Sequence, residues 1–578
     1  MINPYALSFI NLILFIILGL GLITYKFIFP KKNINLFFLL ILISLLPVWS
    51  IFRPGVYESG DFSLHVTQSI TFYKSLSEGI LIPRWAGQLN ATYGFPAFIF
   101  IYSLPYYIIS FFHFIGFTFI TSTKLLLATS FITSGISMYI WLKDELNARA
   151  GFIAAIFYLY VPYHLVDMHF RADIGEMLAF ALLPINLYLA KKFIKTKSSN
   201  FFILQSLIFA LLIISHPAIS LASPPLIIIY TVFCWLRLRK NNIKVLIISF
   251  ISLCLGVLIS TFSWLPTLSE LKFTHQFLVN SISFPNIFEF IFSPWRYGLL
   301  FQGPKGELSY ILGYIQIGVI IYITYLFLSK KSKLENFSLI SLFFLFFLGY
   351  FFMMLSISEP LWHVIPFIKN FQFAYRLLLF TSIFTSVLGS LILYKVKNVY
   401  IICLIVIVVI GSTILNWGNR RVIPQFNDKY LINQLPLSTA NGGGLGQATP
   451  IWTDPNNTWQ KIVPTKHLEV IKGRTDINEL IRTTNIHEYV INVTEDSILR
   501  ENTLYFPGWN LYINRINYPI SITNQNPKGV IEFKIKKGIY DVVLNFEDTF
   551  IIKISKILSL LGIILILAIG IKSYFSPH

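Results

Sequence analysis

The sequence has few charged residues and few cysteines. Asp, Glu, Lys and Arg together make up 12% of the 578 residues, about half of the share that soluble globular proteins carry. The three cysteines (Cys234, Cys254 and Cys403) have no spacing typical of a disulfide framework or a zinc site. Together with the 55% of hydrophobic residues, the low charge excludes an ordinary soluble protein and indicates that lipid surrounds most of the chain.

Apolar runs of about 20 residues recur along the chain, and each can cross a hydrocarbon core. The formal charge of +19 comes from Lys and Arg clusters in short loops between these runs, which indicates topology rather than nucleic-acid binding. Placing every basic cluster in the cytoplasm predicts thirteen transmembrane helices, with the N-terminus outside and the C-terminus inside the cytoplasmic membrane. The predicted helices are 8–29, 35–52, 121–142, 149–165, 176–195, 201–215, 218–236, 245–265, 309–328, 336–356, 376–395, 399–416 and 550–571.

Residues 96–117 are also apolar, but a crossing there would place every later basic cluster outside the cell. We therefore expect a re-entrant or interfacial segment on the outer face, broken near Pro96 and Pro105. All the long connections then lie outside the cytoplasm. Within a transmembrane domain of residues 1–416 they include the loops 53–120, 266–308 and 357–375.

Residues 417–549 differ from the rest of the chain. Val530–Lys536 and Tyr540–Phe546 alternate apolar and polar side chains around Gly538, which predicts two strands joined by a turn. We expect a β-rich domain outside the cytoplasm, followed by a last transmembrane helix and a cytoplasmic tail in residues 550–578. The predicted domain is almost neutral, with 14 basic and 13 acidic residues in 417–548, which disfavours a nucleic-acid partner.

The first informative polar stretch follows the second predicted helix. Asp61 and His65 are four residues apart, so a helix that starts at Asp61 places both on one face. Asp61 could act as a general base, with His65 orienting it or binding a phosphate. The alternative is that Asp61 only caps a surface helix, and the sequence leaves both readings open.

A second group of charged residues lies at outer helix ends. Glu176 enters a predicted membrane helix, where a charge indicates an ion pair or a site, and Arg171 and Asp173 precede it. The alternative is an interfacial ion pair between Arg171 and Glu176. Arg376 begins another helix, where it can bind a lipid phosphate or extend to the headgroups. We interpret His216, which precedes Pro217 between two helices, as part of a turn.

Several short motifs of the sequence, in their order along the chain, are typical of known membrane protein families. They are Gly60-Asp61 with His65, Pro83-Arg84-Trp85, Tyr93-Gly94-Phe95-Pro96, Pro162-Tyr163, Trp295-Arg296-Tyr297-Gly298, Phe371-Gln372-Phe373 and Tyr505-Phe506-Pro507-Gly508-Trp509. The order of loops and acidic motifs resembles the GT-C superfamily of polytopic membrane glycosyltransferases. The phrases are more similar to a bacterial group labelled 6-pyruvoyl-tetrahydropterin synthase-related membrane proteins, and the last phrase resembles YfhO-like membrane proteins.

The resemblance implies a GT-C-like fold that transfers a sugar from a polyprenyl-phosphate donor at the outer membrane face. The acceptor would be a cell-envelope glycan, lipid or protein, and the mechanism would be inverting. A divalent cation, Mg or Mn, would bind at Asp61 with help from Glu58. The implied catalytic residues are Asp61, His65, Asp173 and Glu176, and the implied donor-phosphate residues are Arg376, Arg171 and Arg84. Arg84, next to Trp85, is equally typical of an interface anchor.

Three other functions are weighed against this one. Pterin synthase chemistry needs a histidine cluster on zinc, whereas the ten histidines here are scattered. A scaffold that kept the fold and lost the chemistry remains open, because fold does not imply function. A transporter is less favoured, because no inverted repeat is visible and the polar groups gather at outer helix ends.

Overall fold

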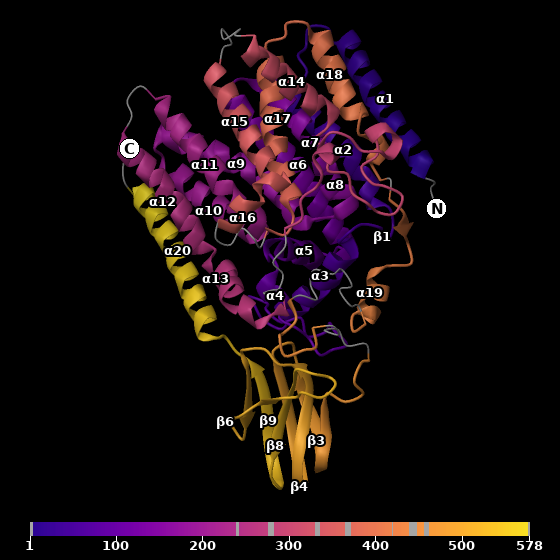
Figure 1. Cartoon of the computed structure of the whole chain (residues 1–578), viewed down its shortest axis with the longest axis vertical. Helices are drawn as coiled ribbons and strands as arrows, with labels where there is room; N and C mark the ends of the chain where they lie inside the picture. The colour runs from indigo at the N-terminus through magenta and orange to yellow at the C-terminus, as the bar shows by residue number, and fades with distance from the viewer. Residues whose placement is uncertain are drawn as a thin grey trace.

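Apolar helices lie side by side above a β-sheet domain at one end of the molecule (Figure 1). The protein is described from a computed structural model. The described residues are 4–238, 242–275, 282–329, 336–364, 371–418, 420–437, 448–455 and 462–575.

The apolar helices coincide one for one with the thirteen predicted segments. Among the described residues, seven helices are long and apolar enough to cross a membrane. Three further candidates are pairs of helices bent by more than 40° at a short break, and three apolar helices are shorter. The polytopic helical fold class is thus confirmed, while the orientation across the membrane stays a prediction. The long helices are α1 (Pro4–Ile28), α6 (Phe119–Glu145), α9 (Ile174–Thr196), α11 (Pro217–Leu236), α17 (Leu378–Leu393), α18 (Val399–Gly411) and α20 (Phe550–Phe575). The bent pairs are α7 (Ala148–Leu159) with α8 (Pro162–Val166), α12 (Ile243–Ile259) with α13 (Thr261–Glu270), and α15 (Phe337–Met353) with α16 (Glu359–Val364). The shorter helices are α2 (Leu36–Val48), α10 (Ser199–Ser215) and α14 (Tyr314–Leu328).

The helices divide into a central group and a peripheral group. In α17, 83% of the most apolar window is buried by protein, and the shares for α9 and α6 are 72% and 67%. The shares for α1 and α20 are only 11% and 22%, and these two helices flank opposite sides of the bundle (Figure 1). Exposed apolar surface of this kind on outer helices is what a lipid environment requires.

Residues 96–117 form a broken path, as the sequence indicated. They contain α4 (Ala97–Phe100) and α5 (Leu104–Phe114), separated by three non-helical residues. Neither helix is long enough to cross a bilayer. Both lie in the first predicted outer loop, close to α3 (Phe62–Ser77), and this segment forms one wall of the site described below.

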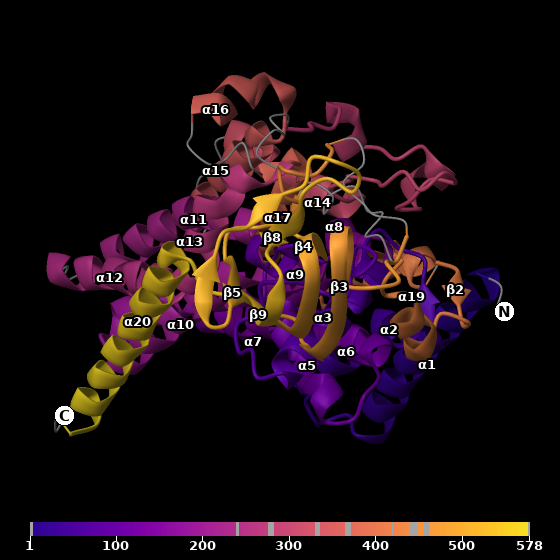
Figure 2. The ribbon, with the colours of Figure 1, turned by 90° about the horizontal axis from the view of Figure 1, so that it is seen from below.

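The C-terminal sheet has a strongly bent central strand. Its order is β6-β5-β9-β4-β8-β7, and β3 pairs with β4. The first half of β4 pairs with β9 and the second half pairs with β8, so one strand serves both sides of the bend (Figure 2). The strands are β3 (Leu468–Arg482), β4 (Ile486–Leu504), β5 (Trp509–Ile513), β6 (Ile516–Tyr518), β7 (Ser521–Ile522), β8 (Val530–Ile535) and β9 (Gly538–Phe546).

The described residues between the helical bundle and this sheet lie against the first outer loop. The short strand β2 (Val422–Ile423) pairs with β1 (Val56–Tyr57). In α19 (Asp428–Gln434), the Asp428 carboxylate accepts hydrogen bonds from the first backbone amides of α6. Within the predicted domain 417–549, the sheet itself therefore begins only at Leu468.

The sheet is fixed to the loop 53–120, the first predicted outer loop, by polar and aromatic contacts. Arg84 forms an ion pair with Asp548 at 2.9 Å, and the amide of Leu504 donates to the carbonyl of Tyr93 at 2.9 Å. The Trp85 ring contacts the rings of β5 and β9 at centroid distances of 5.5 and 5.1 Å. These contacts are buried and hold the β-domain in one position on the loop.

Candidate functional site

Asp61 is the N-cap residue of α3, but its side chain does not cap the helix. The capping hydrogen bond goes instead to Ser59, whose Oγ accepts from the amide of Phe62 at 3.0 Å. Among the described residues, the Asp61 carboxylate has no hydrogen bond or ion pair. The alternative in which Asp61 only caps a helix therefore does not account for its carboxylate.

The backbone holds Asp61 directly against the second charged motif. The amides of Gly60 and Asp61 donate to the carbonyls of Phe170 and Arg171, each at 2.8 Å. A Cβ on Gly60 would lie 3.3 Å from the Arg171 carbonyl oxygen, so this close approach favours glycine. Residues more than a hundred positions apart are thus joined at one point.

Arg171 lies at the centre of a buried cluster of acidic side chains. Its Nη2 donates to Asp173 at 2.8 Å and to Glu176 at 3.2 Å, and its Nη1 donates to Asp167. Nη1 also donates to the hydroxyl of Tyr163 at 2.8 Å. The ion pair between Arg171 and Glu176 that was one reading of the sequence does form, but it lies inside a larger network.

Arg376 completes this network from the 3-10 turn Ala374–Leu377, which precedes α17. Its Nε donates to Glu176 Oε1 at 3.1 Å, and its Nη1 donates to the Phe371 carbonyl at 2.9 Å. Within the described ranges, Nη2 of Arg376 has no partner, and the side chain is 14% exposed. A cationic donor is therefore left available beside the acids.

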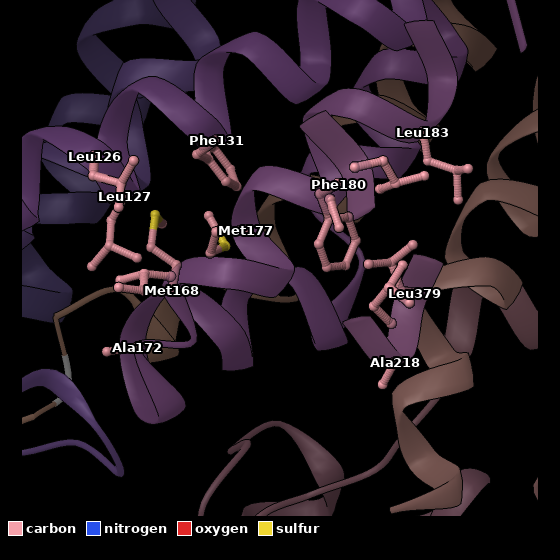
Figure 3. Packing of buried hydrophobic residues seen from close by; sticks show 14 of the residues in the cluster. Leu126, Leu127, Phe131, Met168, Ala172, Met177, Phe180, Leu183, Ala218 and Leu379 are labelled. Atoms are coloured by element: carbon pink, nitrogen blue, oxygen red, sulfur yellow. The ribbon is translucent and has the colours of Figure 1, made fainter. Parts of the chain in front are cut away.

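Apolar side chains pack between the helices that carry the charged residues. Side chains from α6, α9 and α17 lie close together, with Met168, Ala172 and, from α11, Ala218 (Figure 3). Phe180 stacks on His164 with a ring separation of 3.9 Å. Electrostatic interactions in such a buried environment are stronger than on an open surface.

His65 lies one turn into α3 and contacts Tyr106 of α5. Its Nδ1 is 2.8 Å from the Tyr106 hydroxyl, which donates to Gln68 Oε1 at 2.5 Å. Because this hydroxyl proton goes to Gln68, Nδ1 of His65 carries a proton and Nε2 has the free lone pair. Burial lowers the pKa of His65, against the opposing effect of Asp61, so the ring is neutral.

His216 faces the same cluster from the break between α10 and α11. Its Nε2 lies 3.8 Å from Glu176 and 4.0 Å from Asp173, and the Tyr102 ring covers it at 5.4 Å. Burial lowers the pKa of His216 to about 4. The residue does form the turn expected from the sequence, but it also belongs to the site, which sequence reasoning missed.

The carboxyl groups differ in their electrostatics. Burial raises the pKa of Asp61, and the opposing effects of His65, Arg171 and Arg376 are smaller. Burial acts in the same direction on Asp173, but Arg171, His216 and Arg376 outweigh it and hold the pKa of Asp173 well below its ordinary range. Asp61 is therefore the more basic carboxylate of the two.

Asp173, Glu176 and His216 are spaced as metal ligands, with their ligand atoms within 4.8 Å of one another. The acids at the site, including Asp61, outnumber the guanidiniums. Carboxylate oxygens suit Mg or Mn, whereas the imidazole is a more common ligand of metals such as Zn. These residues therefore fit a divalent cation. The Ile219 amide donates to Nδ1 of His216 at 3.3 Å, so ligation through Nε2 requires the other tautomer.

Two residues named from the sequence lie apart from this cluster. Arg84 binds Asp548 and the carbonyl of Glu547, and joins the outer loop to the β-domain. Glu58 is 40% exposed and lies 3.8 Å from Arg420. No described contact brings either residue to the acids, so Arg84 is not placed to hold a donor phosphate there, and Glu58 is not placed to share a metal with Asp61.

Comparison of the sequence with known proteins finds a relative that matches over part of its length. An uncharacterized protein of Lactococcus lactis subsp. cremoris (strain MG1363) is 23% identical over 321 residues, which cover 53% of this chain. The match covers 51% of that relative, so the chain spans about half of its length.

Two solved membrane enzymes are similar over parts of their length. The mycobacterial arabinofuranosyltransferase AftD is 13% identical, with 68% of this chain and 27% of that chain covered and a TM-score of 0.40. The oligosaccharyltransferase AglB of Archaeoglobus fulgidus is 12% identical, with 66% and 55% covered and a TM-score of 0.39.

Residues 99–422 match a family of membrane proteins described by a 6-pyruvoyl-tetrahydropterin synthase related domain. This stretch contains the charged residues at positions 171, 173, 176 and 376. Because it makes up more than half of the 578 residues, the chain belongs to the 6-pyruvoyl-tetrahydropterin synthase related family of membrane proteins.

Proposed function

We propose that this protein is an inverting glycosyltransferase of the GT-C type. It takes a sugar from a polyprenyl-phosphate donor at the extracytoplasmic face of the cytoplasmic membrane. The acceptor is a cell-envelope glycan, lipid or protein. The observation that supports this function best is the Asp61 carboxylate, which has no partner among the described residues and lies near the buried guanidinium of Arg171 and the partly buried guanidinium of Arg376.

Asp61 acts as the general base in this proposal. A base must be free to accept a proton, and the carboxylate of Asp61 has no partner among the described residues. It removes the proton of an acceptor hydroxyl while the oxygen attacks the anomeric carbon of the donor. The bond between that carbon and the phosphate oxygen breaks, and the configuration at the carbon inverts.

Arg376 stabilises the phosphate that leaves. Negative charge develops on the leaving oxygen, and a fixed guanidinium beside it lowers the barrier. Glu176 holds the guanidinium by its Nε, at 3.1 Å, and leaves Nη2 toward the ligand. Arg171 is held by its acidic neighbours in three ion pairs. It therefore stabilises the leaving phosphate through the electric field of its charge more than by direct contact with the phosphate.

His65 and the acids of α9 position the reacting groups. Nδ1 of His65 is fixed by Tyr106, and its Nε2 is an acceptor that faces the site from one turn beyond Asp61. A divalent cation would be held by Asp173, Glu176 and His216, with Asp61 beside them. When bound, it would neutralise excess carboxylate charge and attract the donor phosphate.

A transfer assay tests the proposal. The full chain is placed in liposomes with radiolabelled polyprenyl-phosphate sugars, and labelled product is measured for the wild type and for Asp61→Asn. We expect transfer from at least one donor by the wild type, and a loss of roughly 100- to 10,000-fold in the variant.

The outcome that contradicts the enzyme is also defined. If the wild type transfers no sugar, and Asp61→Asn restores the envelope of a deletion strain as well as the wild type does, the scaffold function takes its place. The matched control is Glu58→Gln, which removes an acid at the exposed rim of the same loop and should leave transfer unchanged.

A further inference from the structure

A cavity lies at the C-terminal end of α3, away from Asp61, where the helix meets the β-domain. Its volume is about 220 Å³, more than ten times what one ordered water requires. One wall comes from the first outer loop and includes Lys74, Glu78 and Gln88. The other wall comes from the strands β3 and β4 and the turn between them, with Arg482, Thr484 and His487.

The two walls are fixed relative to one another. The amide of Thr484 donates to Glu78 Oε2 at 2.8 Å, which ties the turn between β3 and β4 to the end of α3. The cavity therefore does not depend on a mobile loop. Binding to a preformed cavity of this kind has a low cost in conformational entropy.

Polar atoms in this cavity lack partners. Among the described residues, the hydroxyl of Thr484 has no hydrogen-bond partner, although the residue is only 2% exposed. Gln88 Oε1 and Thr92 Oγ1 in the same lining are also buried without a partner in the described part of the chain. A buried polar group normally finds a hydrogen bond, so three such atoms around one cavity indicate a ligand with several hydroxyl or amide groups.

The charges that line the cavity are already balanced. Lys74 pairs with Glu78 at 3.3 Å, and Arg482 pairs with the fully buried Glu501 at 2.7 Å. Burial would raise the pKa of Glu501, but Arg482 and His487 lower it to about 2, so the pair is ionised at neutral pH. A cavity with paired charges and unsatisfied neutral groups suits an uncharged ligand better than an anion.

We propose that this cavity binds one or two neutral sugar units of a glycan, at a distance from the catalytic residues. The unpartnered hydroxyl of Thr484, the amide oxygen of Gln88 and the Arg482–Glu501 pair are donors and acceptors of the kind that sugar hydroxyls need. The buried face of Trp85 forms an apolar floor.

The position of the cavity gives it a role in acceptor binding, which rests on the proposed glycosyltransferase function. Lys74 and Asp61 are at opposite ends of one helix, about 20 Å apart at 1.5 Å per residue. A single sugar cannot reach both places. An extended glycan can lie along α3, with its growing end at Asp61 and an earlier unit in the cavity.

Direct binding tests the cavity without any donor. The full chain in nanodiscs is applied to an array of neutral hexose and N-acetylhexosamine oligosaccharides of increasing length, beside oligosaccharides that carry carboxylates or phosphates. We expect the wild type to bind neutral glycans. Thr484→Val removes a hydroxyl that has no protein partner, so the fold is kept and binding should weaken about tenfold.

A second variant fills the space. A Cβ on Gly87 would lie 3.5 Å from Trp85 and 3.8 Å from Thr484, so Gly87→Leu fits the backbone and should abolish binding. Thr494→Val, at an exposed position in the middle of β4, is the control. It removes a hydrogen bond to the Arg474 carbonyl but no group that lines the cavity, and it should bind like the wild type.

Three results would overturn the proposal: no neutral glycan bound by the wild type, a preference for the charged oligosaccharides, or full binding by both Thr484→Val and Gly87→Leu. The Asp61→Asn variant separates this proposal from the catalytic one. Glycans of one or two units, which fill only the cavity, should bind to it as they bind to the wild type, although its transfer is strongly reduced. If the wild type transfers sugar but binds no neutral glycan, only the cavity proposal fails.

Discussion

Arg376 and Glu176, which are 200 positions apart in the chain, are joined by a hydrogen bond of 3.1 Å from Nε to Oε1. The same oxygen accepts from Arg171 at 3.2 Å. Glu176 has no exposed surface, so one buried carboxylate holds two guanidiniums. The contact fixes the start of α17 against the start of α9, and it positions the cation that the proposed reaction needs.

Removing the charge of Glu176 should be costly. Glu176→Gln leaves two buried cations with less neutralising charge, and we expect the free energy of unfolding to fall by about 3–5 kcal/mol. Unfolding in detergent, followed by tryptophan fluorescence, measures the loss. The control is Glu479→Gln in the half-exposed pair with His467, where the loss should be at most about 1 kcal/mol. Equal effects of the two substitutions would contradict the role given to Glu176.

The acid side of the pH profile should report Asp61. Burial raises its pKa above the ordinary value of 3.8, and a general base works only when ionised. The rate therefore falls as the pH falls through this raised pKa, at a pH above 3.8. The pH dependence of kcat/KM measures it, and Glu58→Gln should leave the profile unchanged. A profile that is flat down to the ordinary carboxyl pKa would exclude Asp61 as the base.

The raised pKa of Asp61 also gives a test of stability, because the ionised carboxylate is expected to destabilise the folded chain. Because the pKa of Asp61 is higher in the folded chain than in the unfolded chain, its ionised form reduces stability at pH values above the folded pKa. Asp61→Asn should therefore keep or raise the unfolding temperature at pH 7 while it abolishes transfer. A large fall in the unfolding temperature would show that the carboxylate has a structural role.

Gly175 allows His216 and Tyr102 to approach the cluster. A Cβ there would lie 2.6 Å from the Ser215 carbonyl oxygen, 2.8 Å from Tyr102 and 3.0 Å from His216. Gly175→Ala should destabilise the chain by about 1–3 kcal/mol and weaken transfer. Gly318→Ala in α14 has no atom within 4 Å of its new Cβ and should be neutral or slightly stabilising. Thermal unfolding of both variants decides the point, and equal unfolding temperatures would contradict the packing account.

Divalent cations should bind in the absence of any substrate. The cluster of Asp173, Glu176 and His216 has the spacing of a metal site, and binding to the folded chain alone raises its unfolding temperature. We expect Mn²⁺ to stabilise the wild type and to show a bound EPR signal. His216→Ala should lose both effects, whereas His363→Ala, at an exposed pair, should keep them. Identical signals from both variants would place the metal elsewhere.

The sequence predicted the helical architecture well, because bilayer thickness sets the length of each apolar run. The positions of the basic residues also indicated that residues 96–117 are not a membrane span, and the structure divides them into two short helices. The start of the sheet at Leu468 was not visible, because residues 422–434 form a short strand and a helix that pack on the first outer loop. Pairing of that kind depends on residues far away in the chain.

The site was only partly predictable. Asp61, Asp173, Glu176 and Arg376 stood out because charges at outer membrane-helix ends are rare, and the structure brings them together. His216 was missed because its only local signal is a histidine before a proline. Arg84 was expected to hold the donor phosphate, but in the structure it pairs with Asp548. The two residues are hundreds of positions apart, so no local sequence pattern predicts that contact.

The structure of the full chain with a bound polyprenyl phosphate tests the central claim most directly. The account predicts the phosphate within hydrogen-bonding distance of Arg376 Nη2. A phosphate oxygen other than the one that carries the prenyl chain, the position of the sugar in the donor, should face the Asp61 carboxylate across the space for one sugar. Cryo-electron microscopy in nanodiscs can resolve both contacts. A phosphate bound away from Arg376, or on the far side of the bundle from Asp61, would contradict the proposed reaction.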